Sequence, residues 1–125
     1  MEALGQVLVV EDDRDQREVL AEVIRDLGWD VRTVADGVEG LALLEGGLRP
    51  AIVLLDMVMP RMDGAEFLAR LRDHPDRDIA RTQVILMTGM PHHARALLKP
   101  YAPDGILVKP FAVRELGATL AHFSR

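Results

Sequence analysis

The chain has 125 residues, of which 49% are hydrophobic, so it is long enough for one domain with its own core and too short for two. Its 15 basic and 20 acidic residues give no electrostatic reason to expect direct binding to nucleic acid, and the lack of cysteine excludes disulfides and thiolate metal sites. Because no apolar stretch could span a bilayer and no signal peptide is evident, we expect a cytoplasmic protein that forms one domain over residues 1–125.

Short apolar runs alternate with amphipathic segments along the chain, a pattern typical of strands joined by helices. The apolar runs predict strands at residues 6–10, 29–37, 52–55, 84–87 and 106–108. Apolar side chains at helical spacing predict helices at residues 14–27, 38–45, 65–73, 90–98 and 113–123. The first helix is expected to bury the face that carries Val19, and the second to bury Val38, Leu41 and Ala42. Residues 74–83 are expected to form a polar loop.

The run at residues 52–55 is apolar throughout, which indicates a strand buried on both faces of a parallel sheet. Strands and helices that alternate in this way predict an α/β fold, a doubly wound five-stranded parallel sheet with five helices. The small version of this architecture has the strand order 2-1-3-4-5. In that order the first and third strands are neighbours, and their carboxyl ends flank the crevice where ligands bind.

Four of the apolar runs end in a polar side chain that could carry chemistry. Glu11 and Asp12 follow the first run, Asp56 the third, Thr88 the fourth and Lys109 the fifth. In a parallel sheet these ends lie on one edge, so the side chains are expected to converge there. Clustered carboxylates repel one another and suit Mg²⁺, which binds through one or two carboxylates and a substrate phosphate. An Asp56 oxygen could then attack phosphorus and form an aspartyl phosphate.

Four motifs together resemble a known family. They are VLVVEDD near the start, DMVMPRMDG in the middle, MTG after the fourth predicted strand and VKPF after the fifth. In this order and spacing they resemble the CheY-like receiver domain of two-component response regulators, over essentially the whole chain. The resemblance implies a signalling module rather than an enzyme, in which a phosphoryl group shifts the balance between two conformations.

The same resemblance implies a phosphoacceptor and a metal site. Asp56 would accept the phosphoryl group, and Mg²⁺ would be held by Glu11, Asp12, Asp56 and the backbone carbonyl of Val58. Val58 and Met90 are apolar where polar residues of relatives can orient a hydrolytic water. We therefore hypothesise an aspartyl phosphate that lasts hours rather than seconds.

A phosphate-dependent switch is implied at the ends of the last two strands. Thr88 would be the switch hydroxyl, Gly89 would leave its loop free to move, and Lys109 would contact the phosphate and precede Pro110 through a cis peptide bond. Members of the family often carry an aromatic residue at the position of Ile106, three residues before the lysine. Ile106 has no ring to flip, so switching must use the loop after Thr88 or another side chain.

Other functions remain open on the residues alone. A haloacid-dehalogenase-like, Mg²⁺-dependent phosphatase would need a second acidic residue two positions after Asp56, where this chain has Val58. A protein that binds a nucleotide or flavin would need a glycine-rich first loop in place of EDDRD. The third alternative is a degenerate receiver that acts as a phosphorylation-independent interaction module. It stays open because Ile106 stands where the family often has an aromatic residue.

The implied partners follow from the signalling function. The phosphodonor would be a phosphohistidine on a sensor histidine kinase or a histidine phosphotransfer protein. The surface built by residues 90–98, 106–108 and 113–123 adjoins Thr88 and Lys109. We expect this surface to meet a downstream partner, an output domain or a second copy in a homodimer, with no direct contact to nucleic acid or membrane.

Overall fold

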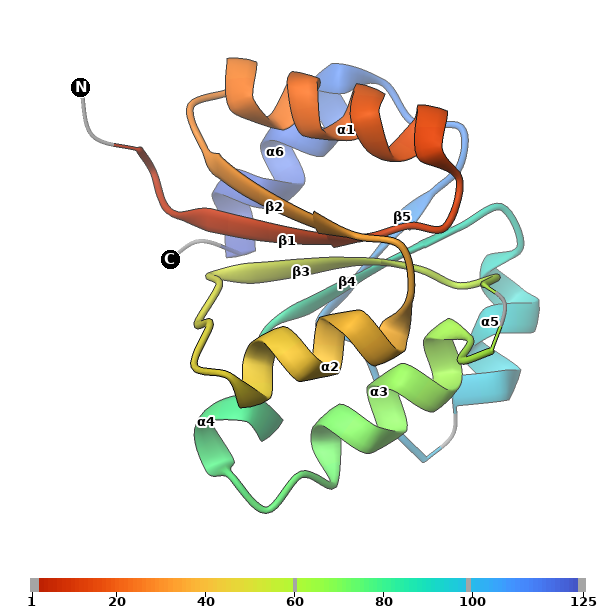
Figure 1. The fold of residues 1–125 in the computed structure, drawn as a ribbon. Helices are drawn as coiled ribbons and strands as arrows, with labels where there is room; N and C mark the ends of the chain where they lie inside the picture. The colour runs from red at the N-terminus through yellow and green to blue at the C-terminus, as the bar shows by residue number, and fades with distance from the viewer. Residues whose placement is uncertain (1–2, 60, 99, 124–125) are drawn as a thin grey trace.

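The computed structural model describes residues 3–59, 61–98 and 100–123, so Pro60 of the DMVMPRMDG motif lies outside the described residues. One sheet of five parallel strands runs through the molecule in the order β2-β1-β3-β4-β5, which confirms the predicted fold class (Figure 1). The strands are β1 (Gln6–Val10), β2 (Asp30–Val34), β3 (Ile52–Asp56), β4 (Val84–Thr88) and β5 (Gly105–Val108).

Helices cover both faces of the sheet. They are α1 (Arg14–Asp26), α2 (Gly37–Glu45), α3 (Gly64–Arg72), α4 (Arg77–Ala80), α5 (Pro91–Leu98) and α6 (Val113–Phe123). Figure 1 shows α1 and α6 above the sheet and α2, α3 and α5 below it. None of the described helices is both long and apolar enough to cross a membrane.

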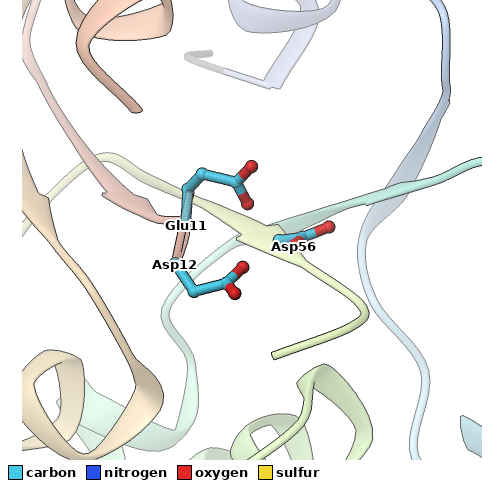
Figure 2. Close-up of side chains that lie close together, drawn as sticks. All are labelled: Glu11, Asp12 and Asp56. Carbon is cyan, nitrogen blue, oxygen red and sulfur yellow. The ribbon is translucent and has the colours of Figure 1, made fainter. Parts of the chain in front are cut away.

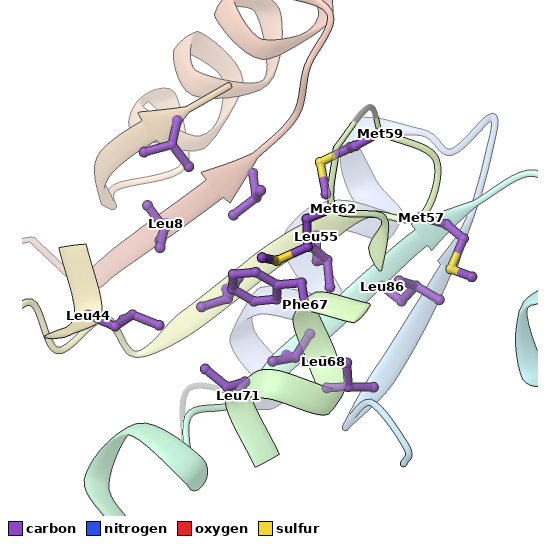
Figure 3. Close-up of a cluster of buried hydrophobic side chains, with 14 of the residues drawn as sticks. Leu8, Leu44, Leu55, Met57, Met59, Met62, Phe67, Leu68, Leu71 and Leu86 are labelled. Carbon is purple, nitrogen blue, oxygen red and sulfur yellow. The ribbon is translucent and has the colours of Figure 1, made fainter. Parts of the chain in front are cut away.

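Alternate residues of the inner strands point into two separate cores, one on each face of the sheet. Leu8 and Leu55 belong to the core under α2, α3 and α5, which Phe67 fills at its centre (Figure 3). Val9 and Leu54 belong to the core under α1 and α6. Every residue of β3 is buried, which explains why its sequence shows no alternation between apolar and polar residues.

The short helix α4 was not predicted. It lies within residues 74–83, which were expected to form a polar loop, and it raises the number of helices among the described residues from five to six. The Asp76 carboxylate caps it by accepting the backbone N–H of Asp78, and Ile79 is its one buried residue. A single turn carries too few apolar positions to show a helical period, so the sequence pattern could not indicate it.

The predicted inner faces of two helices were wrong in part. Val19 of α1 is 61% exposed and Val38 of α2 is 52% exposed, and Ala42 is exposed as well. The inner face of α2 instead carries Gly37 and Gly40 with Leu44. A Cβ atom added at Gly40 would lie 3.2 Å from the Phe67 ring, so the helix reaches the core through glycines, which give no hydrophobic signal in the sequence.

The turn after β3 is held against the strand by a close backbone approach. Asp63 caps α3 by accepting the backbone N–H of Glu66, and the Gly64 N–H donates to the Met57 carbonyl at 2.9 Å. A Cβ atom added at Gly64 would lie 2.9 Å from both the Asp56 carbonyl oxygen and the Met57 Cα. Glycine is therefore required at this position, because backbone atoms cannot yield as a flexible side chain can.

We expect Gly64→Ala to lower the free energy of unfolding by about 1–3 kcal/mol, because the new methyl group forces α3 away from the end of β3. The matched variant is Gly117→Ala, in the interior of α6, where a Cβ atom would lie 3.5 Å from a Leu27 methyl group. This variant should raise stability by about 0.5–1 kcal/mol. Urea denaturation measures both, and a Gly64→Ala protein as stable as the parent would contradict the close approach.

Candidate functional site

The carboxyl ends of four strands meet in one cleft. Glu11 and Asp12 directly follow β1, Asp56 ends β3, Thr88 ends β4 and Lys109 directly follows β5. These five side chains line a cleft of about 350 Å³ together with Asp13, Gln16, Met57, Val58 and Gly89. The predicted convergence at one edge of the sheet is therefore present in the structure.

Three of the four carboxylates that line this cleft lie close together. Each of Glu11, Asp12 and Asp56 offers an oxygen, and these oxygens lie within 4.8 Å of one another (Figure 2). Glu11 is 1% exposed and Asp56 is 8% exposed, whereas Asp12 faces solvent. The buried Oε2 of Glu11 has no hydrogen-bond partner among the described residues. An unpartnered carboxylate oxygen in an all-oxygen set fits a hard divalent cation such as Mg²⁺.

The cationic group in the cleft is the Lys109 ammonium. Its Nζ donates to Asp56 Oδ1 at 3.1 Å and lies 3.9 Å from Glu11 Oε1. It also donates to the side-chain oxygen of Gln16 at 3.4 Å. The peptide bond from Lys109 to Pro110 is cis. One ammonium thus faces three carboxylates, which leaves the cleft short of positive charge.

This imbalance appears in the protonation of Glu11. Burial raises the pKa of Glu11 from 4.5 to about 8, and the neighbouring Asp56 carboxylate adds to the rise while Lys109 opposes it. Glu11 therefore holds a proton at neutral pH when no cation is bound. A bound divalent cation would have to displace that proton.

Thr88, which carries a hydroxyl group, lines the same cleft as Asp56. Thr88 is 5% exposed, and its Oγ1 accepts the backbone N–H of Met90 at 3.0 Å. A Cβ atom added at Gly89 would meet only the Lys109 carbonyl oxygen, at 3.9 Å. The loop after β4 therefore combines a hydroxyl group, whose own hydrogen can be donated, with open space around the next residue.

Ile106 and Tyr101 lie outside the cleft. Ile106 is half-buried against the core under α2, α3 and α5. The Tyr101 hydroxyl donates to the Asp73 carboxylate at the end of α3, and this hydrogen bond raises the pKa of Tyr101. Tyr101 therefore ties the segment before β5 to α3.

Two residues of the site were not predicted from the sequence. Gln16 reaches Lys109, and Arg17 donates through one guanidinium nitrogen to the carbonyl oxygens of Glu11 at 2.9 Å and Asp12 at 3.3 Å. Both lie in the first turns of α1, directly after the acidic pair. Their position in the sequence could have indicated this role, because a helix that closely follows β1 must begin at the same edge of the sheet as the cleft.

Comparison with known proteins gives relatives over nearly the whole chain. The family model "Response regulator receiver domain" matches residues 7–121. The response regulator MprA of Mycobacterium sp. (strain KMS) is 36% identical over 120 residues, which make up 96% of this chain and 50% of that protein. The transcriptional regulatory protein TcrA of Mycobacterium tuberculosis is 39% identical over 122 residues, 96% of this chain and 46% of that protein. The chain spans about half the length of these curated relatives.

Solved structures agree in fold. The receiver domain of the sensor histidine kinase PA1611 from Pseudomonas aeruginosa, described with a magnesium ion coordinated in its active site cleft, superposes with a TM-score of 0.86 at 26% identity, covering 96% of this chain and 97% of that one. The chemotaxis protein CheY4 of Vibrio cholerae superposes with a TM-score of 0.80 at 29% identity over 98% and 99% of the two chains. Fold, acidic cleft and sequence relatives agree: this chain belongs to the receiver domains of response regulators, the phosphorylation-accepting domains of two-component systems.

Proposed function

We propose that residues 1–125 act as a single receiver domain whose phosphoacceptor is Asp56. The observation that carries this assignment is the position of its carboxylate, which ends the buried strand β3, contacts the Lys109 ammonium at 3.1 Å and lies with Glu11 and Asp12 in one cluster. The phosphodonor is a phosphohistidine of a sensor histidine kinase or a histidine phosphotransfer protein. Receiver domains are generally signalling modules, and we propose the same role for this one rather than that of an enzyme.

We propose Mg²⁺ as the cofactor, held by Glu11, Asp12, Asp56 and the backbone carbonyl of Val58. When bound, it supplies positive charge to the phosphoryl oxygens during transfer. An Asp56 oxygen forms the new bond to phosphorus while the bond from phosphorus to the donor's imidazole nitrogen breaks. Lys109 leaves its ion pair with the free carboxylate and holds a phosphoryl oxygen.

The switch follows from the same geometry. After transfer the Thr88 hydroxyl donates to a phosphoryl oxygen and draws the loop through Gly89 and Met90 toward Asp56. Apart from its chain neighbours, Gly89 is not crowded by the described residues, since an added Cβ atom would meet only the Lys109 carbonyl oxygen, and this favours the movement. Ile106 lies opposite Leu86 of β4, packs against the core and transmits the shift by packing rather than by the rotation of a ring.

Two surfaces suit two partners. An apolar groove of about 630 Å³ runs between α1 and the segment after β5, and it includes Val19, Leu20, Phe111 and Lys109. Because Lys109 also lines the acidic cleft, this groove is our proposed docking site for the phosphodonor.

The downstream partner, output domain or second copy meets the face of α5, β5 and α6, where Val108 is 47% exposed.

The phosphatase alternative gains no support from the cleft. Val58, which takes the place of the second acid, is 78% exposed. The interaction-only alternative is disfavoured because the acceptor, the acidic pair, the hydroxyl group and the ammonium all line one cleft. We therefore retain phosphorylation-dependent signalling as the function.

Incubation with acetyl phosphate and Mg²⁺ should add one phosphoryl group to the protein, because the small donor needs only the cleft. Intact mass spectrometry measures the addition. Asp56→Asn and removal of Mg²⁺ should each abolish it. Asp63→Asn, in the same loop and outside the residues that line the cleft, should be modified as the parent is. Modification that persists in Asp56→Asn would show that another residue is the acceptor.

The affinity for Mg²⁺ should increase with pH up to about 8 and change little above it, because the proton held by Glu11 must leave when the cation binds. Below that pH the dissociation constant should rise by up to about tenfold per unit. Isothermal titration calorimetry between pH 6 and pH 9 would measure it, with Glu11→Gln as the comparison. The variant should bind more weakly and lose most of the pH dependence, and an equal dependence in both proteins would contradict this role of Glu11.

The aspartyl phosphate should last for hours, because Val58 and Met90, which are 78% and 64% exposed, offer no polar side chain to orient a hydrolytic water. Val58→Asn should shorten its lifetime several-fold. Val38→Asn changes an exposed valine on α2 away from the cleft and should leave the lifetime unchanged. The decay of the phosphorylated mass after removal of the donor gives all three values, and decay within seconds in the parent protein would refute the hypothesis.

A further inference from the structure

One buried carboxylate lies outside the cleft. Three acidic side chains are buried among the described residues, and two of them, Glu11 and Asp56, belong to the site. The third is Asp36, which is 1% exposed and lies directly before α2. Burying a carboxylate is costly unless both of its oxygens find partners. The partners of Asp36 therefore indicate what the buried charge does.

Each oxygen of Asp36 serves a different part of the chain. Oδ1 accepts the backbone N–H of Glu39 at 2.9 Å and caps α2. Oδ2 pairs with the guanidinium group of Arg61, which lies in the loop between Asp56 and α3. Arg61 has a φ of 66°, in the left-handed region that residues other than glycine rarely adopt. The ion pair thus joins the start of α2 to the middle of the loop that follows the phosphoacceptor.

A second contact runs beside the ion pair. Met62 packs over Gly37, so closely that a Cβ atom added at Gly37 would lie 2.8 Å from the Met62 sulfur. Met62 is 5% exposed, and Met59 of the same loop is 8% exposed (Figure 3). Two adjacent loop residues, Arg61 and Met62, therefore meet two adjacent residues at the start of α2. The contact is charged on one side and apolar on the other.

Among the described residues, the centre of the loop has few other attachments. The start of the loop is fixed by Asp56 in β3, and its end by the Gly64 N–H bond to the Met57 carbonyl. Between these points, the described residues that attach the loop are the buried Met59 and Met62 and the ion-paired Arg61. Methionine side chains adapt easily to shifted surroundings. The directional restraint on this loop among the described residues is therefore the Arg61 ion pair.

We propose that Arg61 and Asp36 are positioning residues for the phosphorylation site, because their ion pair holds the loop after Asp56 against α2. This inference rests on the proposed function, in which the Val58 carbonyl of the same loop holds Mg²⁺. The pair also makes α2 part of the switch. By thermodynamic reciprocity, a cation that orders the loop must stabilise the start of α2, and loosening α2 must weaken binding of the cation.

The test compares Arg61→Ala, Arg61→Lys and Asp36→Asn with the parent protein at a temperature where circular dichroism shows all of them folded. Asparagine still caps a helix, so Asp36→Asn removes the charge while keeping the Glu39 bond. Arg61→Ala should weaken Mg²⁺ binding by about tenfold in calorimetry, the low end for residues that support metal ligands. Arg61→Lys should recover part of this loss. The double variant, Arg61→Ala with Asp36→Asn, should lose no more Mg²⁺ affinity than the worse of these two single variants, because both changes remove the same ion pair.

A second readout needs neither metal nor phosphate. In the metal-free protein, amide hydrogen exchange of residues 57–59 and 61–63 should be faster in Arg61→Ala than in the parent. The matched control is Arg70→Ala, which removes an exposed ion pair to Glu66 on α3 and should change neither exchange nor Mg²⁺ affinity. Unchanged exchange and affinity in folded Arg61→Ala would overturn the inference. Failure of the parent to bind Mg²⁺ would refute the proposed function instead, and the exchange experiment would still decide the role of the ion pair.

Discussion

The cleft depends on the repulsion among three carboxylates that the sheet forces together. Glu11, Asp12 and Asp56 lie within 4.8 Å of one another, and the Lys109 ammonium offsets only part of their charge. Burial is the main cause of the raised pKa of Glu11, and the neighbouring Asp56 carboxylate adds to the rise while Lys109 opposes it. A divalent cation would supply the positive charge that one lysine leaves missing, and it would also offset the negative charge that a phosphoryl group brings to Asp56. Binding of the cation and phosphorylation would therefore be linked through the same shortage of positive charge.

The parallel sheet separates the residues that stabilise the fold from the residues that form the site. The side chains within β1 and β3 fill the two cores, whereas the polar side chains at the carboxyl ends of these strands line the cleft. The loop after β3 contributes both to the core and to the cleft. Met59 and Met62 anchor it in the core, Gly64 lets α3 approach Asp56, and Arg61 reaches Asp36 at the start of α2. A change in the conformation of this loop therefore affects the start of α2 as well as the cleft.

The surfaces that we propose for partners carry apolar residues that the two helical layers leave uncovered. Val19 was expected in the core but is exposed, and with Leu20 and Phe111 it lines the groove beside Lys109. On α2 the apolar residues Val38 and Ala42 face solvent because Gly37 and Gly40 take the inner positions. In both helices some apolar residues therefore face solvent rather than the core. Helical periodicity alone cannot say which of them is left outside.

The alternation of apolar runs and amphipathic segments was enough to predict the α/β architecture, and the observed strand order is the one that the small version of this architecture has. Because strand ends in a parallel sheet share one edge, the pattern also predicted the convergence of five side chains, those of Glu11, Asp12, Asp56, Thr88 and Lys109. These features depend on local patterns and on one topological rule. Three features became evident only in the folded structure: the inner face of α2, the single turn of α4 and the ion pair between Arg61 and Asp36. The inner face of α2 depends on packing around glycine, and the ion pair joins segments that are remote in sequence. The helix α4 is too short to show a helical period, so none of the three leaves a periodic signal in the chain.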